Sequence, residues 1–506
     1  MLFLTRREAL FRSVAFIILA ALLVILLWPT FRSPAQPEDE GIALVQPEMF
    51  LKGHFPYRDF ESLYGPGNLL ILSGAYSLFG ANIFVERSVG LIYRVLILVA
   101  IFGIAQRWGT IIASVCALLA VLLLKTTEVW ANTWIAATAF ALCALWMMAN
   151  IRSRARCFAA GFFGAVALLC RCDFAIALTA SVLPFFVAMK RATKIWFLAG
   201  AAAGLLPLLY FAVAVGPTQL LDSLFLLPIR VSPGAYLPIF GATPDVVWVF
   251  VFYIAANTLN LSAGILALRR TSSEDARLLL GGAILGLGLV HYALSRFDSG
   301  HVLNAALVSF MFLPLSISVL FSVLVKPIPR WFEAIGILAL VLILIPHIRS
   351  EPPEEGIFIK QNGRSFPLGQ NRVPQAADRI LAELQRASVA GQFLFVGPGD
   401  LRRTLYCDTW IYHLFPQLPP ASYFLYMDAG SANVPGSRLT TDVARADWLV
   451  LNRSWDLIPN ESAKFGPDEP NRVVRANCDL WRDSGPYLLL RNKRLRNLID
   501  QHPENE

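Results

Sequence analysis

The sequence has few charged residues for its length. Only 15% of its 506 residues are Asp, Glu, Lys or Arg, whereas 56% are hydrophobic, and the mean hydropathy is +0.57. Soluble domains have roughly 25% charged and about 45–50% apolar residues. The scarcity of charge therefore excludes an ordinary soluble protein and indicates an integral membrane protein.

Features that mark several other classes of protein are missing too. No basic cluster suggests nucleic-acid binding, and no internal repeat is visible. The seven cysteines lack metal-ligand spacing, and the turn at 396–400 lacks the Lys-Ser/Thr of a phosphate-binding loop. The sequence leaves open whether Cys407 and Cys478 pair, because a disulfide there requires export of that region.

Long apolar runs dominate the first two thirds of the chain. Eleven are expected to cross the membrane as helices, because each approaches the length that spans a hydrocarbon core of roughly 30 Å. They lie at 13–29, 88–105, 109–124, 133–150, 158–170, 173–189, 195–213, 246–268, 278–294, 302–325 and 331–346. The stretch 68–79 is too short to span, so we expect it to lie along the interface or re-enter. The first run lacks a cleavage site and is expected to be a retained signal anchor.

Basic residues alternate between the connecting segments. With the N-terminus in the cytoplasm, the cytoplasmic segments hold 15 of the 25 basic residues that precede residue 350. They hold only 4 of the 16 acidic residues of the same region. The positive-inside rule therefore favours this orientation, in a bacterial inner membrane. Polar loops at 30–87, 171–173, 214–245 and 295–301 then share the outer side.

Residues 347–506 differ in composition from the membrane region, residues 1–346. They are polar and Pro-rich, with 18 basic and 19 acidic residues from position 350 onward. A helix is expected at 377–387 and strands at 393–396, 448–452 and 487–490. The chain is thus expected to be an α-helical polytopic membrane protein with a small C-terminal α/β extracytoplasmic domain.

The acidic pair Asp39-Glu40 begins a polar loop just beyond the first apolar run. Carboxylates kept beside a bilayer are costly and are commonly functional. One of them would act as a general base on an acceptor hydroxyl or amine, and the other would orient that group. The alternative is a solvated acidic pair that caps the helix expected at 41–51.

The same loop carries further polar and aromatic side chains. Arg58 has the forked donors that suit a phosphate, and Tyr57 and Tyr64 could stack on a sugar ring. The alternative is a surface ion pair of Arg58 with Asp59 or Glu61, with the tyrosines anchoring the interface.

Two other outer clusters join charges of both signs. Arg171 and Asp173 lie between two short helices and either face a polar cavity or form a self-satisfied pair in a tight turn. Arg296, Asp298 and His301 suit an anion site in which Asp298 sets the histidine tautomer, or form an ordinary polar loop.

Taken together, these motifs resemble polytopic glycosyltransferases of the GT-C class, such as protein O-mannosyltransferases and the lipid A aminoarabinose transferase. The similarity rests on the acidic pair after the first span, on the segments 56–60 and 64–67, and on Glu86-Arg87. The paired short helices near Arg171, the loop 296–301 and the Pro-rich aromatic tail segment 414–427 are similar too.

The resemblance implies an inverting transfer of a sugar from a polyprenyl-phosphate-linked donor to a glycan, lipid or protein acceptor. Asp39 would be the base, with Glu40 its partner or alternate, and Arg58, Arg296 or His301 would bind the phosphate. A divalent metal could assist, although the sequence holds no dedicated carboxylate cage. The alternatives are a transporter or lipid-carrier flippase, which places charges at mid-bilayer, and a non-catalytic membrane scaffold.

Overall fold

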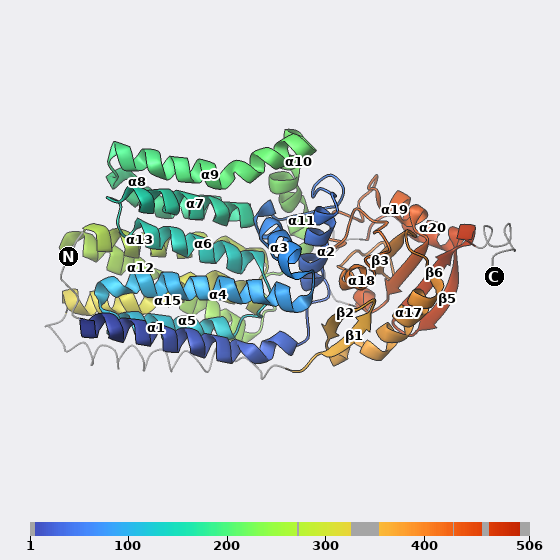
Figure 1. The fold of residues 1–506 in the computed structure, drawn as a ribbon, viewed down its shortest axis with the longest axis horizontal. Helices are drawn as coiled ribbons and strands as arrows, with labels where there is room; N and C mark the ends of the chain where they lie inside the picture. Colours follow the sequence, from blue (N-terminus) through green and yellow to red (C-terminus); the bar gives the residue numbers. More distant parts are fainter. Residues whose placement is uncertain (1–5, 271–272, 325–353, 429, 458–464, 496–506) are drawn as a thin grey trace.

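The computed structural model describes residues 6–270, 273–324, 354–428, 430–457 and 465–495. A bundle of long helices forms one end of an elongated molecule, and a domain built around a small sheet forms the other (Figure 1). The described residues are mostly helical, which confirms the expected fold class. The expected domain boundary at 346/347 lies outside the described residues.

The bundle contains helices at ten of the eleven expected apolar runs, and the run at 331–346 lies outside the described residues. These helices are α1 (Arg6–Leu27), α4 (Ile83–Ala105), α5 (Thr110–Lys125), α6 (Thr133–Met148), α7 (Arg154–Cys170), α8 (Ala175–Ala188), α9 (Arg191–Val215), α12 (Pro244–Arg270), α13 (Ser273–Gly288) with α14 (Val290–Ser295), and α15 (Ser299–Leu324). Within the described part, six helices are long and apolar enough to cross a membrane. The chain is thus an integral multi-pass membrane protein, and the number eleven stays a prediction.

Helices at the rim of the bundle expose apolar side chains, as lipid-facing helices do. Ile17 on α1 and Val213 on α9 are 63% and 81% exposed. Helices α4 and α15 are largely buried inside the bundle. This arrangement fits helices whose outer face is covered by lipid.

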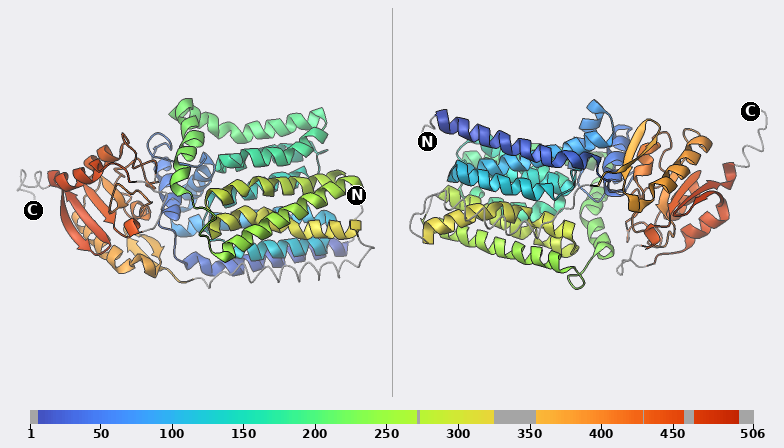
Figure 2. Two further views of the ribbon diagram at one scale, coloured as in Figure 1. Left: turned by 180° about the vertical axis from the view of Figure 1, so that it is seen from behind. Right: turned by 90° about the horizontal axis from the view of Figure 1, so that it is seen from below.

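Short helices close the end of the bundle that faces the C-terminal domain (Figure 2). The stretch expected at 68–79 forms α3 (Pro66–Phe79), which packs against α2 (Asp39–Leu51) and α4. The expected loop 214–245 contains α10 (Pro217–Leu221) and α11 (Leu227–Ala235) joined by a π-helical turn. One side of this segment packs on the protein, since Leu220 and Val231 are buried, while the apolar side chains of Leu221 and Ile229 are exposed.

The C-terminal domain contains a four-stranded sheet of order β3-β4-β6-β5. Strands β3 and β4 are parallel, and the other neighbours are antiparallel. The elements are the hairpin β1 (Ile357–Gln361) and β2 (Arg364–Leu368), then α17 (Pro374–Ala387), β3 (Leu394–Pro398), α18 (Trp410–Leu414), α19 (Leu439–Arg445), β4 (Trp448–Asn452), α20 (Glu469–Asn477), β5 (Cys478–Ser484) and β6 (Tyr487–Asn492). The expected helix and the three expected strands are present. The hairpin and β5 are additional.

The two parts are joined by polar contacts between side chains far apart in sequence. Glu48 of α2 accepts two hydrogen bonds from Arg364 of β2, at 2.6 and 2.8 Å. The Ser431 hydroxyl donates to Glu61. The space between bundle and C-terminal domain is therefore bordered by both, and polar residues from each converge there.

All seven cysteines are free thiols, so Cys407 and Cys478 do not pair. Cys407 is buried, and its Sγ donates to the Leu425 carbonyl at 3.2 Å. Cys478 begins the distant edge strand β5.

We expect dithiothreitol to leave both the thermal unfolding midpoint and the gel mobility of the purified protein unchanged, because no disulfide constrains the unfolded chain. The measurement is a melt and a gel with and without reductant. A mobility shift that Cys478→Ser abolishes would contradict the free-thiol arrangement.

Candidate active site

A cavity of about 660 Å³ lies between the end of the bundle and the C-terminal domain. Its lining comes from the start of α2, the loop after α5, the turn between α7 and α8, the α14–α15 connection and the segment 406–428. Seven candidate residues from the sequence line it together: Asp39, Tyr64, Arg171, Asp173, Arg296, Asp298 and His301. The cavity thus combines carboxylates, cations and phenols that are distant in sequence.

Asp39 is the first residue of α2 and faces this cavity. Its Oδ1 accepts a hydrogen bond from the Tyr426 hydroxyl at 2.7 Å. Burial raises the pKa of Asp39 above its ordinary value, and the Tyr426 hydrogen bond opposes this rise. The charges of His301 and Arg296 lower the pKa of Asp39 as well. Burial therefore favours the protonated form of Asp39, whereas Tyr426, His301 and Arg296 favour its carboxylate form.

Glu40, the next residue, does not line the cavity and pairs with Arg87 inside the protein. It is 2% exposed and receives a forked pair of hydrogen bonds from Arg87 at 2.9 and 3.0 Å. The other guanidinium nitrogen of Arg87 donates to the carbonyls of Thr30 and Ser33, both at 2.9 Å. Successive helical residues point in directions about 100° apart, so the two carboxylates of the pair meet different environments.

Arg171 is held by an aspartate and by aromatic rings. Its Nε and one terminal nitrogen donate to Asp173 at 3.0 and 2.6 Å. Its guanidinium carbon lies 5.1–5.2 Å from the ring centroids of Tyr64, Trp134 and Tyr292, within cation–π range. The sequence left open whether this cluster faces a polar cavity or forms a self-satisfied pair. The structure has both, because the Arg–Asp pair itself lines the cavity.

Two glycines at the start of α3 allow it to pack closely against the end of α7. A Cβ at Gly65 would stand 2.1 Å from the Leu169 carbonyl oxygen, and one at Gly67 would stand 2.7 Å from the Cys170 backbone nitrogen. The start of α3 therefore touches the end of α7. As a result, Tyr64 lies over Arg171.

Arg296 and His301 share Asp298. Arg296 Nε donates to Asp298 at 2.9 Å, and its Nη1 donates to the Tyr406 hydroxyl at 2.8 Å. The His301 ring Nδ1 lies 2.9 Å from Asp298 Oδ1, so the carboxylate orients the imidazole. Tyr406 has φ = 74°, which is uncommon for a bulky residue, and its ring packs on Tyr426.

Other candidates lie outside this cavity. Arg58 pairs with Asp59 at 2.8 Å on the surface, and its side chain is 48% exposed. Tyr57 is buried and donates from its hydroxyl to the Tyr64 carbonyl at 2.8 Å. Glu61 is buried, and its burial raises its pKa to about 7.

The cavity also contains residues that the sequence reasoning did not single out. They are Gln36, Glu38, Glu128, Trp130, Tyr292, Tyr406, Tyr426 and Asp428. Asp428 has one buried oxygen without a hydrogen-bond partner, and burial raises its pKa well above the ordinary range. Tyr426 lies within the aromatic tail segment 414–427, and Asp428 directly follows it. That segment was the only sequence signal for the side of the cavity that the C-terminal domain forms. Among the described residues, no group of three His, Cys, Asp or Glu side chains is arranged to hold a metal.

No protein-family model matches the sequence, and no curated protein matches it. The fold is nevertheless that of the GT-C class of polytopic glycosyltransferases, as the motifs suggested. The chain is similar to the crystal structure of ArnT from Cupriavidus metallidurans bound to undecaprenyl phosphate, with 14% identity and a TM-score of 0.55. The match covers 94% of this chain and 97% of that one, so the whole architecture is shared.

Two further solved structures are similar at lower scores. ArnT in the apo state has 13% identity and a TM-score of 0.47, over 95% of this chain and 98% of that one. The arabinofuranosyltransferase AftD from Mycobacteria has 13% identity and a TM-score of 0.45, over 96% of this chain and 42% of that one. At these scores neither match bears on function.

We expect Glu40→Ala to reduce the free energy of unfolding by about 3–5 kcal/mol, because it leaves a buried guanidinium without its partner. The control is Glu355→Ala, which breaks a pair with Arg32 whose side chains are 72% and 70% exposed. That pair contributes about 1 kcal/mol or less. Thermal unfolding in detergent measures both variants. Equal losses would contradict the anchoring role of Glu40.

Proposed function

We propose that this protein is a membrane glycosyltransferase that moves a sugar from a polyprenyl-phosphate-linked donor to an acceptor. The observation that carries the proposal is the cavity in which Asp39 lies with Arg171, Arg296 and His301 at the end of an apolar bundle. The similar ArnT structure was determined with bound undecaprenyl phosphate, which supports a polyprenyl phosphate as carrier here.

Asp39 is the proposed general base. Its carboxylate would take the proton of the acceptor hydroxyl while the acceptor oxygen bonds to the anomeric carbon. The bond from that carbon to the phosphate oxygen breaks in the same step, and polyprenyl phosphate leaves. A single displacement of this kind inverts the anomeric configuration. Glu40 is engaged by Arg87, so it supports the position of Asp39 and does not accept the proton.

Arg171, Arg296 and His301 are the proposed binding groups for the phosphate. Both guanidinium groups are already oriented by aspartates, at 2.6 and 2.9 Å. Donors fixed before the reaction stabilise a developing phosphate charge without further reorganisation. Arg58 is 48% exposed and lies outside the cavity, so it is not part of this proposal.

The proposed orientation follows the positive-inside rule, with the N-terminus in the cytoplasm of a bacterial cell. The cavity and the C-terminal domain would then face the extracytoplasmic side. Arg107 and Arg152 pair with Glu274 in the connections at the opposite end of the bundle. These basic connections would be cytoplasmic.

We expect Asp39→Asn to lower sugar transfer by about a hundredfold or more, because general-base catalysis contributes roughly 10²–10⁴-fold. The measurement is transfer from a polyprenyl-phosphate sugar in membranes that contain equal amounts of variant and wild-type protein. Asp59→Asn is the matched control, because Asp59 lies on the surface outside the cavity. Undiminished transfer by Asp39→Asn would refute the assignment of the base.

The pH dependence provides a second test. Because the base must be ionised, kcat/KM should rise with pH through the pKa of Asp39, above the pH at which an ordinary aspartate ionises. Arg296 lowers this pKa, so Arg296→Gln should move the rising limb to higher pH. Arg58→Gln removes the same charge outside the cavity and should leave the limb in place. A limb that Arg296→Gln does not move would contradict the electrostatic link.

A further inference from the structure

A second cavity, of about 340 Å³, lies beside the first between the loop after α1, the outer end of α5 and the segment 369–372 of the C-terminal domain. The two cavities share Gln36, Thr126, Thr127 and Glu128 as lining residues. The second cavity therefore adjoins the proposed active site through a common wall.

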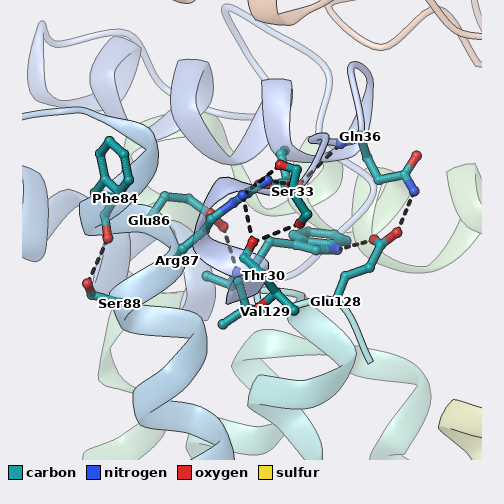
Figure 3. A network of polar contacts seen from close by, with 12 residues as sticks. Thr30, Ser33, Gln36, Phe84, Glu86, Arg87, Ser88, Glu128 and Val129 are labelled. Carbon is teal, nitrogen blue, oxygen red and sulfur yellow. Dashed lines mark hydrogen bonds and ion pairs between the residues drawn. The ribbon is translucent and has the colours of Figure 1, made fainter. Parts of the chain in front are cut away.

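The common wall includes the side chains of Gln36 and Glu128, which are joined by a hydrogen bond (Figure 3). Gln36 Nε2 donates to Glu128 Oε1 at 2.7 Å, and the Trp130 indole N–H donates to Glu128 Oε2 at 3.1 Å. A hydroxyl group can replace an amide as donor to a carboxylate. A ligand hydroxyl that replaced Gln36 as donor to Glu128 would stand at the boundary with the first cavity, whose lining includes Asp39.

The floor of the second cavity is rigidly held. Thr30 and Ser33 line it, and their carbonyls accept hydrogen bonds from Arg87, which Glu40 fixes. A site whose backbone is fixed in advance loses less entropy when a ligand binds.

Two cations line this cavity without an ion-pair partner. Lys125 ends α5, and Arg372 follows β2 with its guanidinium carbon 4.4 Å from the Trp455 ring centroid. Among the described residues, neither makes an ion pair within 4.0 Å. Arg171 and Arg296 of the first cavity, in contrast, are each paired with an aspartate. Lys125 and Arg372 thus bring two positive charges to a lining in which Glu128, held by Gln36 and Trp130, is the carboxylate among the described residues.

The remaining lining indicates what kind of anion would fit. Hydroxyl and amide side chains, including Thr30, Thr127 and Asn371, line it together with small apolar residues such as Pro34 and Ala35. An Arg fork and a Lys ammonium are the usual ligands of phosphate. A volume of about 340 Å³ is near the lower limit for small-molecule sites.

We propose that the second cavity binds a phosphate ester on the acceptor, through Lys125 and Arg372, and directs a neighbouring acceptor hydroxyl across the Gln36–Glu128 wall to Asp39. This proposal rests on the proposed glycosyltransferase function for the role of Asp39. The phosphate could belong to a lipid headgroup or to a soluble phosphorylated polyol, since both present the same chemistry.

The test is calorimetric titration of full-length protein in phosphatidylcholine nanodiscs with glycerol 3-phosphate, with glycerol as the uncharged probe. We expect binding of the phosphate ester but not of glycerol. The double variant Lys125→Gln/Arg372→Gln should bind at least about tenfold more weakly, because it loses two charge-assisted contacts.

The matched control is Lys360→Gln/Arg379→Gln, which removes the same charge from exposed positions of the C-terminal domain and should bind like wild type. Arg296→Gln should also retain binding, because Arg296 lines the first cavity only. Full binding by Lys125→Gln/Arg372→Gln, loss of binding in Arg296→Gln alone, or no binding by wild type would overturn the proposal.

Asp39→Asn separates this proposal from the proposed function, because it should keep glycerol phosphate binding and lose only transfer. Persistent transfer in that variant would refute the base while the anion site stands. Nanodiscs with phosphatidylglycerol identify the source of the phosphate. Weaker glycerol phosphate binding there supports occupation by lipid headgroups, and unchanged binding supports a soluble phosphate ester.

Discussion

The buried ion pair between Glu40 and Arg87 is the interaction on which the arrangement of the site depends. It joins the start of α2 to α4, and Arg87 also holds the carbonyls of Thr30 and Ser33 in the loop after α1. With α2 fixed in this way, Asp39, about 100° round the helix from Glu40, faces the large cavity. A buried pair with several additional hydrogen bonds tolerates the loss of hydration that an isolated charge would not. The pair thus sets the geometry of both cavities.

The C-terminal domain completes the site as well as covering it. Tyr426 holds Asp39, and Tyr406 accepts a hydrogen bond from Arg296. Both tyrosines approach from the segment that closes the cavity opposite the bundle. The proposed reaction therefore takes place in a space that neither the bundle nor the C-terminal domain encloses alone. This division explains why a polar domain of such different composition is attached to an apolar bundle.

Much of the fold was predictable because its signals are local. Apolar runs define the bundle helices, and short continuous apolar runs between turns define the strands at 394–398 and 448–452. The proposed outer position of the candidate clusters rests on the placement of basic residues. The hairpin β1–β2 and the helices α10 and α11 escaped prediction, because short amphipathic segments are stabilised mainly by what they pack against. The contribution of Tyr406, Tyr426 and Asp428 to the cavity was not predicted for a related reason. The residues that the tyrosines contact lie more than a hundred residues away in the sequence.

The sequence by itself determined that this is a membrane protein with an acidic pair, several arginines and a histidine on one proposed side of the bilayer. Only the tertiary structure decided which members of that set meet. Asp39 and Glu40 are neighbours in the chain, yet the helical rotation of about 100° per residue directs one to a cavity and the other to an arginine. Arg58 and Arg296 have the same chemistry, and packing leaves the first on the surface and brings the second to the cavity. Residue type can be read from the sequence, but the direction and burial of a side chain depend on contacts between distant segments.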